Sequence, residues 1–304
     1  MIRGLITTVL LLTNTVLLFI PLLGFAIIKI LTPMASVQKH CSRILVLIAE
    51  SWAELDKMIF AIMTKTRWEI QGVESLDRAA SYMIISNHQS WVDIPALIQT
   101  FNRKIPYFKF FLKKELIWVP LLGFVWWVLD YPFMQRYSKS FIQAHPECKG
   151  KDLELTRTAC EKFKTIPVTI VNYLEGTRFS SKKHAAQKSP YQQLLKPRAG
   201  GLAFSLAAIG EQLNTILDVT VIYPDVNEVP SFWDLMSGKV DRVVVDVRSL
   251  AIEPWMYEGD YENDPHFREA FQQWISAIWL EKDHTIARYQ GVTENISQFD
   301  QVQV

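Results

Sequence analysis

The sequence predicts an α/β protein with a mixed, mostly parallel central sheet flanked by helices, preceded by a helical segment that anchors it in a membrane. Three observations predict this arrangement. Short apolar runs, typical of buried strands, alternate with segments of helical periodicity. Residues 5–31 carry one charge, Lys29, and a membrane span needs about 20 apolar residues. The 304 residues, 49% of them hydrophobic, suffice for one large catalytic domain and a small appendage.

Composition and missing motifs exclude several function classes. The 32 Lys and Arg nearly balance the 31 Asp and Glu, so net charge argues neither for nor against a nucleic-acid partner, and none is expected. The three cysteines form no C-x-x-C pair, so neither a disulfide framework nor a zinc knuckle is expected, and a reducing compartment fits. The chain also lacks the G-x-S-x-G elbow of serine hydrolases, an H-E-x-x-H metal motif and a phosphate-binding glycine loop.

Residues 1–40 are expected to anchor the chain in a membrane. A cleavable signal peptide is the competing interpretation, but the apolar run is long and no small-x-small cleavage site follows it cleanly. Pro21 and Gly24 interrupt the run, which leaves either one kinked span or a re-entrant helical hairpin in one leaflet. Positive charge lies on both sides, at Arg3 and Lys39, which gives no orientation and mildly favours the hairpin.

The remaining elements follow in order along the chain. Residues 41–66 combine helical spacing with several charges and predict an amphipathic helix and linker. Residues 67–285 should form the catalytic domain, and residues 286–304 a polar tail. Apolar or alternating runs predict strands at residues 68–72, 81–86, 168–174, 219–223 and 242–248. Helical spacing and caps predict helices that begin at residue 93 and cover residues 199–213 and 265–282.

Two further segments each allow two interpretations. Residues 116–129 contain three tryptophans and no charge, which fits a buried core helix or an apolar patch at a membrane interface. Residues 180–198 are basic, which fits a solvated loop or a segment attracted to anionic lipid or phosphate.

The first candidate site follows the strand at residues 81–86, where the chain reads N-H-Q-S-W-V-D. If a strand turns into a helix there, Asp93 lies one turn from His88. A neutral imidazole can take a proton from an alcohol, while a carboxylate on its other nitrogen fixes the tautomer. The alternative is a strand-end histidine beside a helix that Asp93 caps. Because no serine nucleophile is evident, an active His88 would activate a substrate hydroxyl directly.

The second candidate site, Glu175-Gly176-Thr177-Arg178, follows the strand at residues 168–174. An arginine offers a fork of donors suited to phosphate. Gly176 lets the backbone approach a ligand or turn sharply. The alternative is a strand-to-loop turn with a surface ion pair. Together, the two strand ends indicate acyl or phosphoryl chemistry on an anionic substrate.

These segments, in this order, resemble the four sequence blocks of the lysophospholipid acyltransferase family, which includes the 1-acylglycerol-3-phosphate acyltransferases. The first block corresponds to residues 87–93, and the third to residues 175–178. Block two is similar to residues 111–116 with the distal residues 133–136, and block four to the strand end at residues 221–224. The resemblance covers residues 68–224.

Three sequence features resemble those of a sub-branch of this family that contains lysocardiolipin acyltransferases and bacterial YihG-type acyltransferases. They are Trp91, the D-Y-P at residues 130–132 and the K-P-R-A-G-G at residues 196–201. Asp130 is a departure, because many family members carry glycine at that position.

The resemblance implies a role for each matching residue. His88 would deprotonate the acceptor hydroxyl, and Asp93 would orient His88. The residues implied in binding the acceptor's phosphate region are Glu175, Gly176, Thr177, Arg178, Arg136 and either Lys113 or Lys114. The resemblance implies no metal and no bound cofactor. The acyl donor, acyl-CoA or acyl carrier protein, would be a co-substrate that reacts without an acyl-enzyme.

The sequence therefore predicts a membrane-anchored O-acyltransferase of the glycerolipid acyltransferase fold, active in phospholipid synthesis or remodelling. Its expected partners are membrane lipids, a lysophospholipid acceptor and the acyl donor. Its expected location is a bacterial inner membrane, with the catalytic domain on the cytosolic face where the donors occur. One alternative is a catalytically silent, lipid-binding or regulatory relative of the same fold. Another is a hydrolase that uses water in place of the acceptor.

Overall fold

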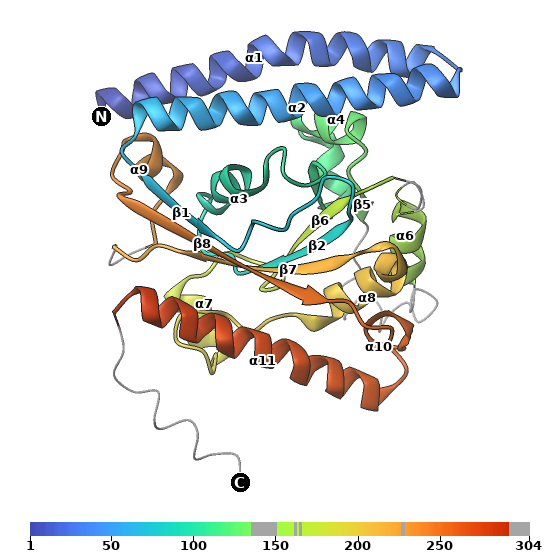
Figure 1. Cartoon of the computed structure of the whole chain (residues 1–304), viewed down its shortest axis with the longest axis vertical. Coiled ribbons are helices and arrows are strands. Elements are labelled where there is room, and N and C mark those ends of the chain that lie inside the picture. The colour runs from blue at the N-terminus through green and yellow to red at the C-terminus, as the bar shows by residue number, and fades with distance from the viewer. Residues whose placement is uncertain (135–150, 161–162, 164–165, 226–228, 292–304) are drawn as a thin grey trace.

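A computed structural model describes residues 1–134, 151–160, 163, 166–225 and 229–291. Within these residues, six strands form one sheet in the order β1-β8-β7-β2-β6-β3 (Figure 1). Strands β7 and β8 pair antiparallel, and every other neighbouring pair is parallel, which confirms the predicted mixed, mostly parallel sheet. The strands are β1 (Arg67–Gln71), β2 (Tyr82–Ser86), β3 (Phe108–Phe110), β6 (Thr169–Tyr173), β7 (Thr215–Ile222) and β8 (Arg242–Ala251).

The central strands are covered on both faces, which explains their continuous apolar sequences. Every residue of β2 is buried. Tyr82 and Ile84 belong to the core cluster with α2 and α3, whereas Met83 and Ile85 belong to the cluster with α8 and α11. The strand ends are therefore the positions from which polar side chains can act. The helices are α2 (Ala35–Met63), α3 (Asp93–Phe101), α8 (Ala199–Ile209) and α11 (Pro265–Tyr289).

Helix α11 lies along the face of the sheet opposite the N-terminal helices (Figure 1). Asp264 caps its start by accepting hydrogen bonds from the backbone N–H groups of His266 and Phe267. The helix continues to Tyr289, past the expected end at residue 282, and Ile286 is fully buried in the core. The polar tail predicted from residue 286 is therefore corrected, because the domain includes the whole of α11.

A buried ion cluster fixes α11 on the sheet. The Lys282 ammonium is fully buried and lies 2.7 Å from Oδ1 of Asp218 in β7. Arg248 of β8 lies 2.6 Å from the other oxygen of the same carboxylate. Removing the Asp218 carboxylate would leave the buried Lys282 ammonium without its counter-ion, so the cluster depends chiefly on Asp218.

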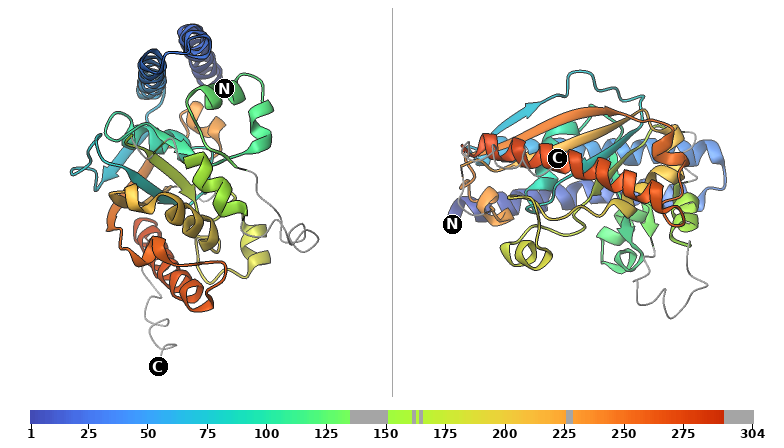
Figure 2. Two further views of the ribbon diagram at one scale, coloured as in Figure 1. Left: turned by 90° about the vertical axis from the view of Figure 1, so that its right-hand side faces the viewer. Right: turned by 90° about the horizontal axis from the view of Figure 1, so that it is seen from below.

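The N-terminal residues form a hairpin of two long helices, α1 (Ile2–Leu31) and α2, joined at residues 32–34 (Figure 2). Helix α1 is continuous with Pro21 inside it, so the alternative of a re-entrant hairpin that turns at Pro21 and Gly24 is wrong. Proline removes one helical hydrogen bond, but α1 packs along α2, with Leu22 and Ala26 buried between them and the domain. The boundary predicted at residue 40 also falls inside α2 and is corrected accordingly.

Within the described part of the chain, α1 is the one helix long and apolar enough to cross a membrane. Both of its ends contact the α/β domain. Gly4 lies against Trp233 of α9 (Phe232–Met236), and Lys29 donates to Oδ2 of Asp130 at 3.0 Å. One face of α1 stays exposed, and its large apolar side chains include Leu5, Val9, Leu12, Val16, Leu17 and Ile20.

The alternative of a buried core helix for residues 116–129 is wrong. A short 3₁₀ helix, η1 (Lys114–Trp118), and α4 (Leu122–Val128) flank a turn at Leu121. Trp118 is 85% exposed and Trp127 is 47% exposed. On the inner side, the Phe124 ring packs edge-on against Phe19 of α1 at 6.5 Å. The segment therefore extends the exposed apolar surface of α1, and its contact with a membrane interface stays a prediction.

Candidate active site

The candidate site lies where three neighbouring parallel strands, β2, β6 and β7, end. In the register of the sheet, Ser86 of β2 is level with Tyr173 of β6 and with Val219 of β7. The loops after β2 and β6 therefore leave the sheet side by side. The backbone N–H of Phe179 in the second loop donates to the His88 carbonyl in the first at 2.7 Å. The strand register thus brings the two candidate sites together.

His88 and Asp93 form a hydrogen-bonded pair. Nδ1 of His88 lies 2.8 Å from Oδ2 of Asp93, the contact expected from their spacing. A carboxylate only accepts, so Nδ1 carries the proton and Nε2 presents a lone pair, which bonds to no other described residue. Asp93 does not cap α3: Val92 is the N-cap, and Oδ2 of Asp93 accepts instead from the backbone N–H groups of Gln89 and Ser90.

Tyr223 completes this arrangement, although the sequence pattern did not identify it as a site residue. Its hydroxyl donates to Oδ1 of Asp93 at 2.5 Å. Burial, and then the charge of Asp93, hold the pKa of Tyr223 well above its ordinary value, so the hydroxyl keeps its proton. Asn87 holds the end of β7 close by exchanging two hydrogen bonds of 2.9 Å with the Val221 backbone. The fully buried Asp93 carboxylate is thus fixed in one orientation toward His88.

The Tyr173 ring stacks on the His88 imidazole. The ring centroids are 4.0 Å apart, and the planes are inclined by 17°. Phe110 of β3 extends the stack at 6.0 Å from Tyr173. The Tyr173 hydroxyl is buried without a hydrogen bond to any described residue, and burial raises its pKa well above the ordinary value. The stack and the bond to Asp93 together restrict rotation of the imidazole.

Glu175 is fully buried and supports His88 from behind. Its Oε1 accepts from the His88 backbone N–H at 3.2 Å, and its Oε2 from the Leu195 N–H at 3.3 Å. Burial raises the pKa of Glu175 to about 8, although these two bonds act to lower it. The prediction that Glu175 binds the acceptor phosphate is therefore corrected. Its carboxyl has no exposed surface, and it positions the loop that carries His88.

Gly176 and Thr177 shape the second loop. Gly176 has φ +67°, and a Cβ there would lie 3.2 Å from Cδ of Arg198, so glycine suits both the turn and the packing. Lys183 Nζ donates to the Thr177 hydroxyl at 2.7 Å and to the carbonyl of Arg178 at 2.8 Å. In this structure Thr177 therefore holds the loop through Lys183.

Arg178 is the cation that the loop presents to solvent. Its guanidinium lies 4.3 Å from the Trp91 ring centroid and has no hydrogen bond or ion pair with a described residue. Lys113, which ends β4 (Leu112–Lys113), and Lys114 are exposed and likewise form no such bond within the described chain. Arg136 lies outside the described residues. Among the residues that are described, no cluster of His, Cys, Asp or Glu could hold a metal ion.

The fold and the site define an α/β protein that carries a partly exposed histidine on a buried aspartate, and an exposed arginine, at neighbouring strand ends. The model of the acyltransferase family matches residues 67–223, just over half of the chain. The chain belongs to this acyltransferase family.

The chain is similar to a 2-acyl-1-lysophosphatidylinositol acyltransferase of Saccharomyces cerevisiae, with 24% identity over 257 residues, 70% of this chain and 62% of that protein. It is 26% identical over 183 residues to 1-acyl-sn-glycerol-3-phosphate acyltransferase delta of Mus musculus, 58% of this chain and 43% of that protein. It thus spans about half the length of these relatives. The crystal structure of the 1-acyl-sn-glycerophosphate acyltransferase PlsC of Thermotoga maritima matches 91% of this chain and 97% of that one, with a TM-score of 0.48 and 15% identity.

Proposed function

We propose that this protein transfers a fatty acyl group from an acyl thioester, acyl-CoA or acyl carrier protein, to the hydroxyl of a lysophospholipid. The observation that carries the proposal is the bond between His88 Nδ1 and Asp93, which leaves Nε2 free to accept a proton. The family of residues 67–223 supports the reaction class. The narrower likeness to lysocardiolipin and YihG-type acyltransferases stays a prediction.

In the proposed reaction, Nε2 of His88 takes the proton of the acceptor hydroxyl while the hydroxyl oxygen attacks the thioester carbonyl carbon. The tetrahedral intermediate then collapses as the carbon–sulfur bond breaks, and the imidazolium returns the proton to the leaving sulfur. Asp93 stabilises the imidazolium that forms between these steps. The products are the acylated phospholipid and a free thiol, so no acyl-enzyme is needed.

Arg178 is the proposed binding residue for the acceptor phosphate. Its donors are unused by the described residues, and a guanidinium pairs well with phosphate oxygens. Stacking on Trp91 holds the guanidinium beside the loop that carries His88. Arg136 and either Lys113 or Lys114 are proposed to assist it, whereas Glu175 acts by positioning.

The proposed location is a bacterial inner membrane, with the catalytic domain on the cytosolic face. Both ends of α1 contact the same α/β domain, at Gly4 and at Lys29. A helix that keeps both contacts cannot cross a bilayer, so α1 should lie within one leaflet. A reporter fused before Met1 should then be accessible from the side of the catalytic domain, and access from the opposite side would contradict this placement.

The reaction is tested with the purified full chain in detergent, a panel of lysophospholipids and labelled acyl-CoA. The proposal predicts esterified lipid and free thiol in equal amounts with at least one acceptor. Binding of lysophospholipid without any transfer would instead support a catalytically silent relative. Release of free fatty acid without esterified lipid would support a hydrolase.

A further inference from the structure

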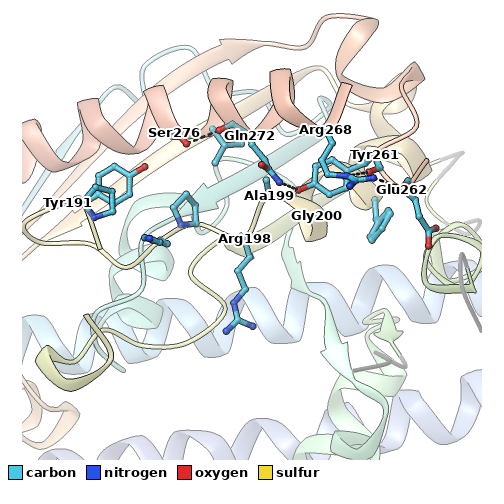
Figure 3. Close-up of a pocket in the computed structure, with 14 residues that line it drawn as sticks. Tyr191, Arg198, Ala199, Gly200, Tyr261, Glu262, Arg268, Gln272 and Ser276 are labelled. Atoms are coloured by element: carbon cyan, nitrogen blue, oxygen red, sulfur yellow. Dashed lines mark hydrogen bonds between the residues drawn. The ribbon is translucent and has the colours of Figure 1, made fainter. Parts of the chain in front are cut away.

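A cavity of about 980 Å³ lies between the segment after the Arg178 loop, the start of α8 and α11 (Figure 3). Three cations, Lys196, Arg198 and Arg268, line it against one carboxylate, Glu262. Arg268 is bound only to backbone carbonyls, and the side chains of Lys196 and Arg198 form no hydrogen bond or ion pair with the described residues. This excess of positive charge suits a ligand with several negative charges.

Aromatic side chains form the rest of the wall. Tyr191, Phe204 and Tyr261 line the cavity, and the Phe204 and Tyr261 rings meet edge to face at 6.0 Å. A Cβ on Gly200 would lie 3.2 Å from the Tyr261 ring, so glycine lets this ring pack against the first turn of α8. Aromatic faces bind planar bases by stacking. The cavity therefore combines surfaces for a planar base with cations for phosphate groups.

Arg198 connects this cavity to the candidate active site. Its side chain lies against Gly176, and its backbone N–H donates to the Leu174 carbonyl at 2.7 Å. Nearby, Leu195 donates to the Glu175 carboxyl, which also holds the His88 backbone. Figure 3 shows Arg198 extending from the start of α8 away from α11. Arg198 thus lines the cavity and also contacts the loop that contains Glu175 and Gly176.

We propose that this cavity binds the nucleotide end of acyl-CoA. The aromatic walls hold the adenine, Arg198 and Lys196 bind the phosphates, and the pantetheine arm passes Gly176 to bring the thioester to His88. This assignment rests on the proposed function and adds to it a preference for one of the two acyl donors. Acyl carrier protein holds its acyl group without an adenine nucleotide, so this cavity favours acyl-CoA as donor.

The test measures KM separately for acyl-CoA and for the acceptor, using the full chain in detergent. Arg198→Ala should raise the KM for acyl-CoA about ten-fold or more, because it removes a charged phosphate contact, and should leave the acceptor KM unchanged. Arg198→Lys should recover part of the loss. The matched control is Lys182→Ala, which removes another exposed cation of the same basic segment outside the cavity and should change neither KM. Lys196→Ala serves as a second variant should Arg198→Ala fold poorly.

Binding of adenosine 3′,5′-bisphosphate, followed by calorimetry, probes the cavity without turnover. It should bind the unsubstituted protein, compete with acyl-CoA and bind Arg198→Ala more weakly. An unchanged KM for acyl-CoA in both cation variants, a rise confined to the acceptor KM, or no binding of the bisphosphate would overturn the assignment. A protein that binds the bisphosphate but acylates no lysophospholipid would refute the proposed function and leave the nucleotide site standing.

Discussion

The Tyr223 hydroxyl donates a 2.5 Å hydrogen bond to one oxygen of Asp93, whose other oxygen accepts from His88. Tyr223 follows β7, whereas Asp93 opens α3, so the contact joins two distant parts of the chain. It stabilises the Asp93 carboxylate and fixes it against the imidazole. Tyr223 is therefore a positioning residue for the proposed base.

Tyr223→Phe should lower kcat about ten-fold or more, because a hydrogen bond to a charged group is lost. The KM values for donor and acceptor should change little, because Tyr223 contacts Asp93 and none of the proposed binding residues. The measurement is kcat and KM for both substrates.

The matched control for Tyr223 is Tyr131→Phe. The Tyr131 hydroxyl also makes a buried hydrogen bond, to the Phe108 carbonyl at 3.1 Å, but not to the His–Asp pair. This variant should lose some stability and keep the wild-type kcat. A wild-type kcat in folded Tyr223→Phe would show that Tyr223 has only a structural role.

Glu175 should make stability depend on pH. Its pKa is about 8 in the folded protein against 4.5 for an ordinary glutamate, so the folded state holds a proton that the unfolded state releases. The stabilising contribution is complete below about pH 4.5 and is lost as pH rises toward about 8. The midpoint of thermal unfolding in detergent should fall over this range more steeply than in Glu175→Gln, which cannot titrate. Equal slopes would show that Glu175 is already ionised in the folded protein.

Arg178→Ala should weaken binding of the acceptor and leave binding of the acyl donor unchanged. The loss of one charge-assisted bond to phosphate corresponds to about one to two decades in the acceptor KM. Arg178→Lys should restore part of this, since it keeps the charge but loses the planar fork. Equal losses for both substrates would place Arg178 in a structural role.

Trp118 and Trp127 should matter only when the acceptor lies in a bilayer. Both side chains are exposed beside α1, and tryptophan is favoured at membrane interfaces. Serine at both positions should lower acyl transfer on vesicles several-fold and leave transfer in detergent unchanged. Leu280→Ser in α11, an exposed apolar position on the opposite layer, is the control. An equal loss in detergent would exclude a role at the membrane.

Local sequence signals were sufficient for much of the fold. The apolar run that forms β2 and the turn into α3 were readable because each depends on neighbouring residues. The contact between His88 and Asp93 could be predicted for the same reason. The continuity of α1 through Pro21 could not, because it depends on packing against α2 and the domain.

Contacts between residues on different strands could not be predicted from local sequence patterns. Tyr223 meets Asp93 only because β7 lies next to β2, an order that no spacing in the chain reveals. Glu175 resembled a ligand residue in its motif, but its carboxyl is buried and accepts from the backbone N–H groups of His88 and Leu195. Likewise, the proposed role of Lys196 and Arg198 depends on their position beside Tyr261 and α11, which no local sequence pattern reveals.

The most direct test of the central claim is acyl transfer by His88→Ala in detergent, with folding checked by thermal unfolding and His40→Ala as the control from an exposed site on α2. Loss of a general base corresponds to about two to four decades in rate. The rate of acyl transfer by folded His88→Ala should fall by this amount, whereas His40→Ala should stay active. Near-normal turnover by folded His88→Ala would contradict the role of His88 as the general base.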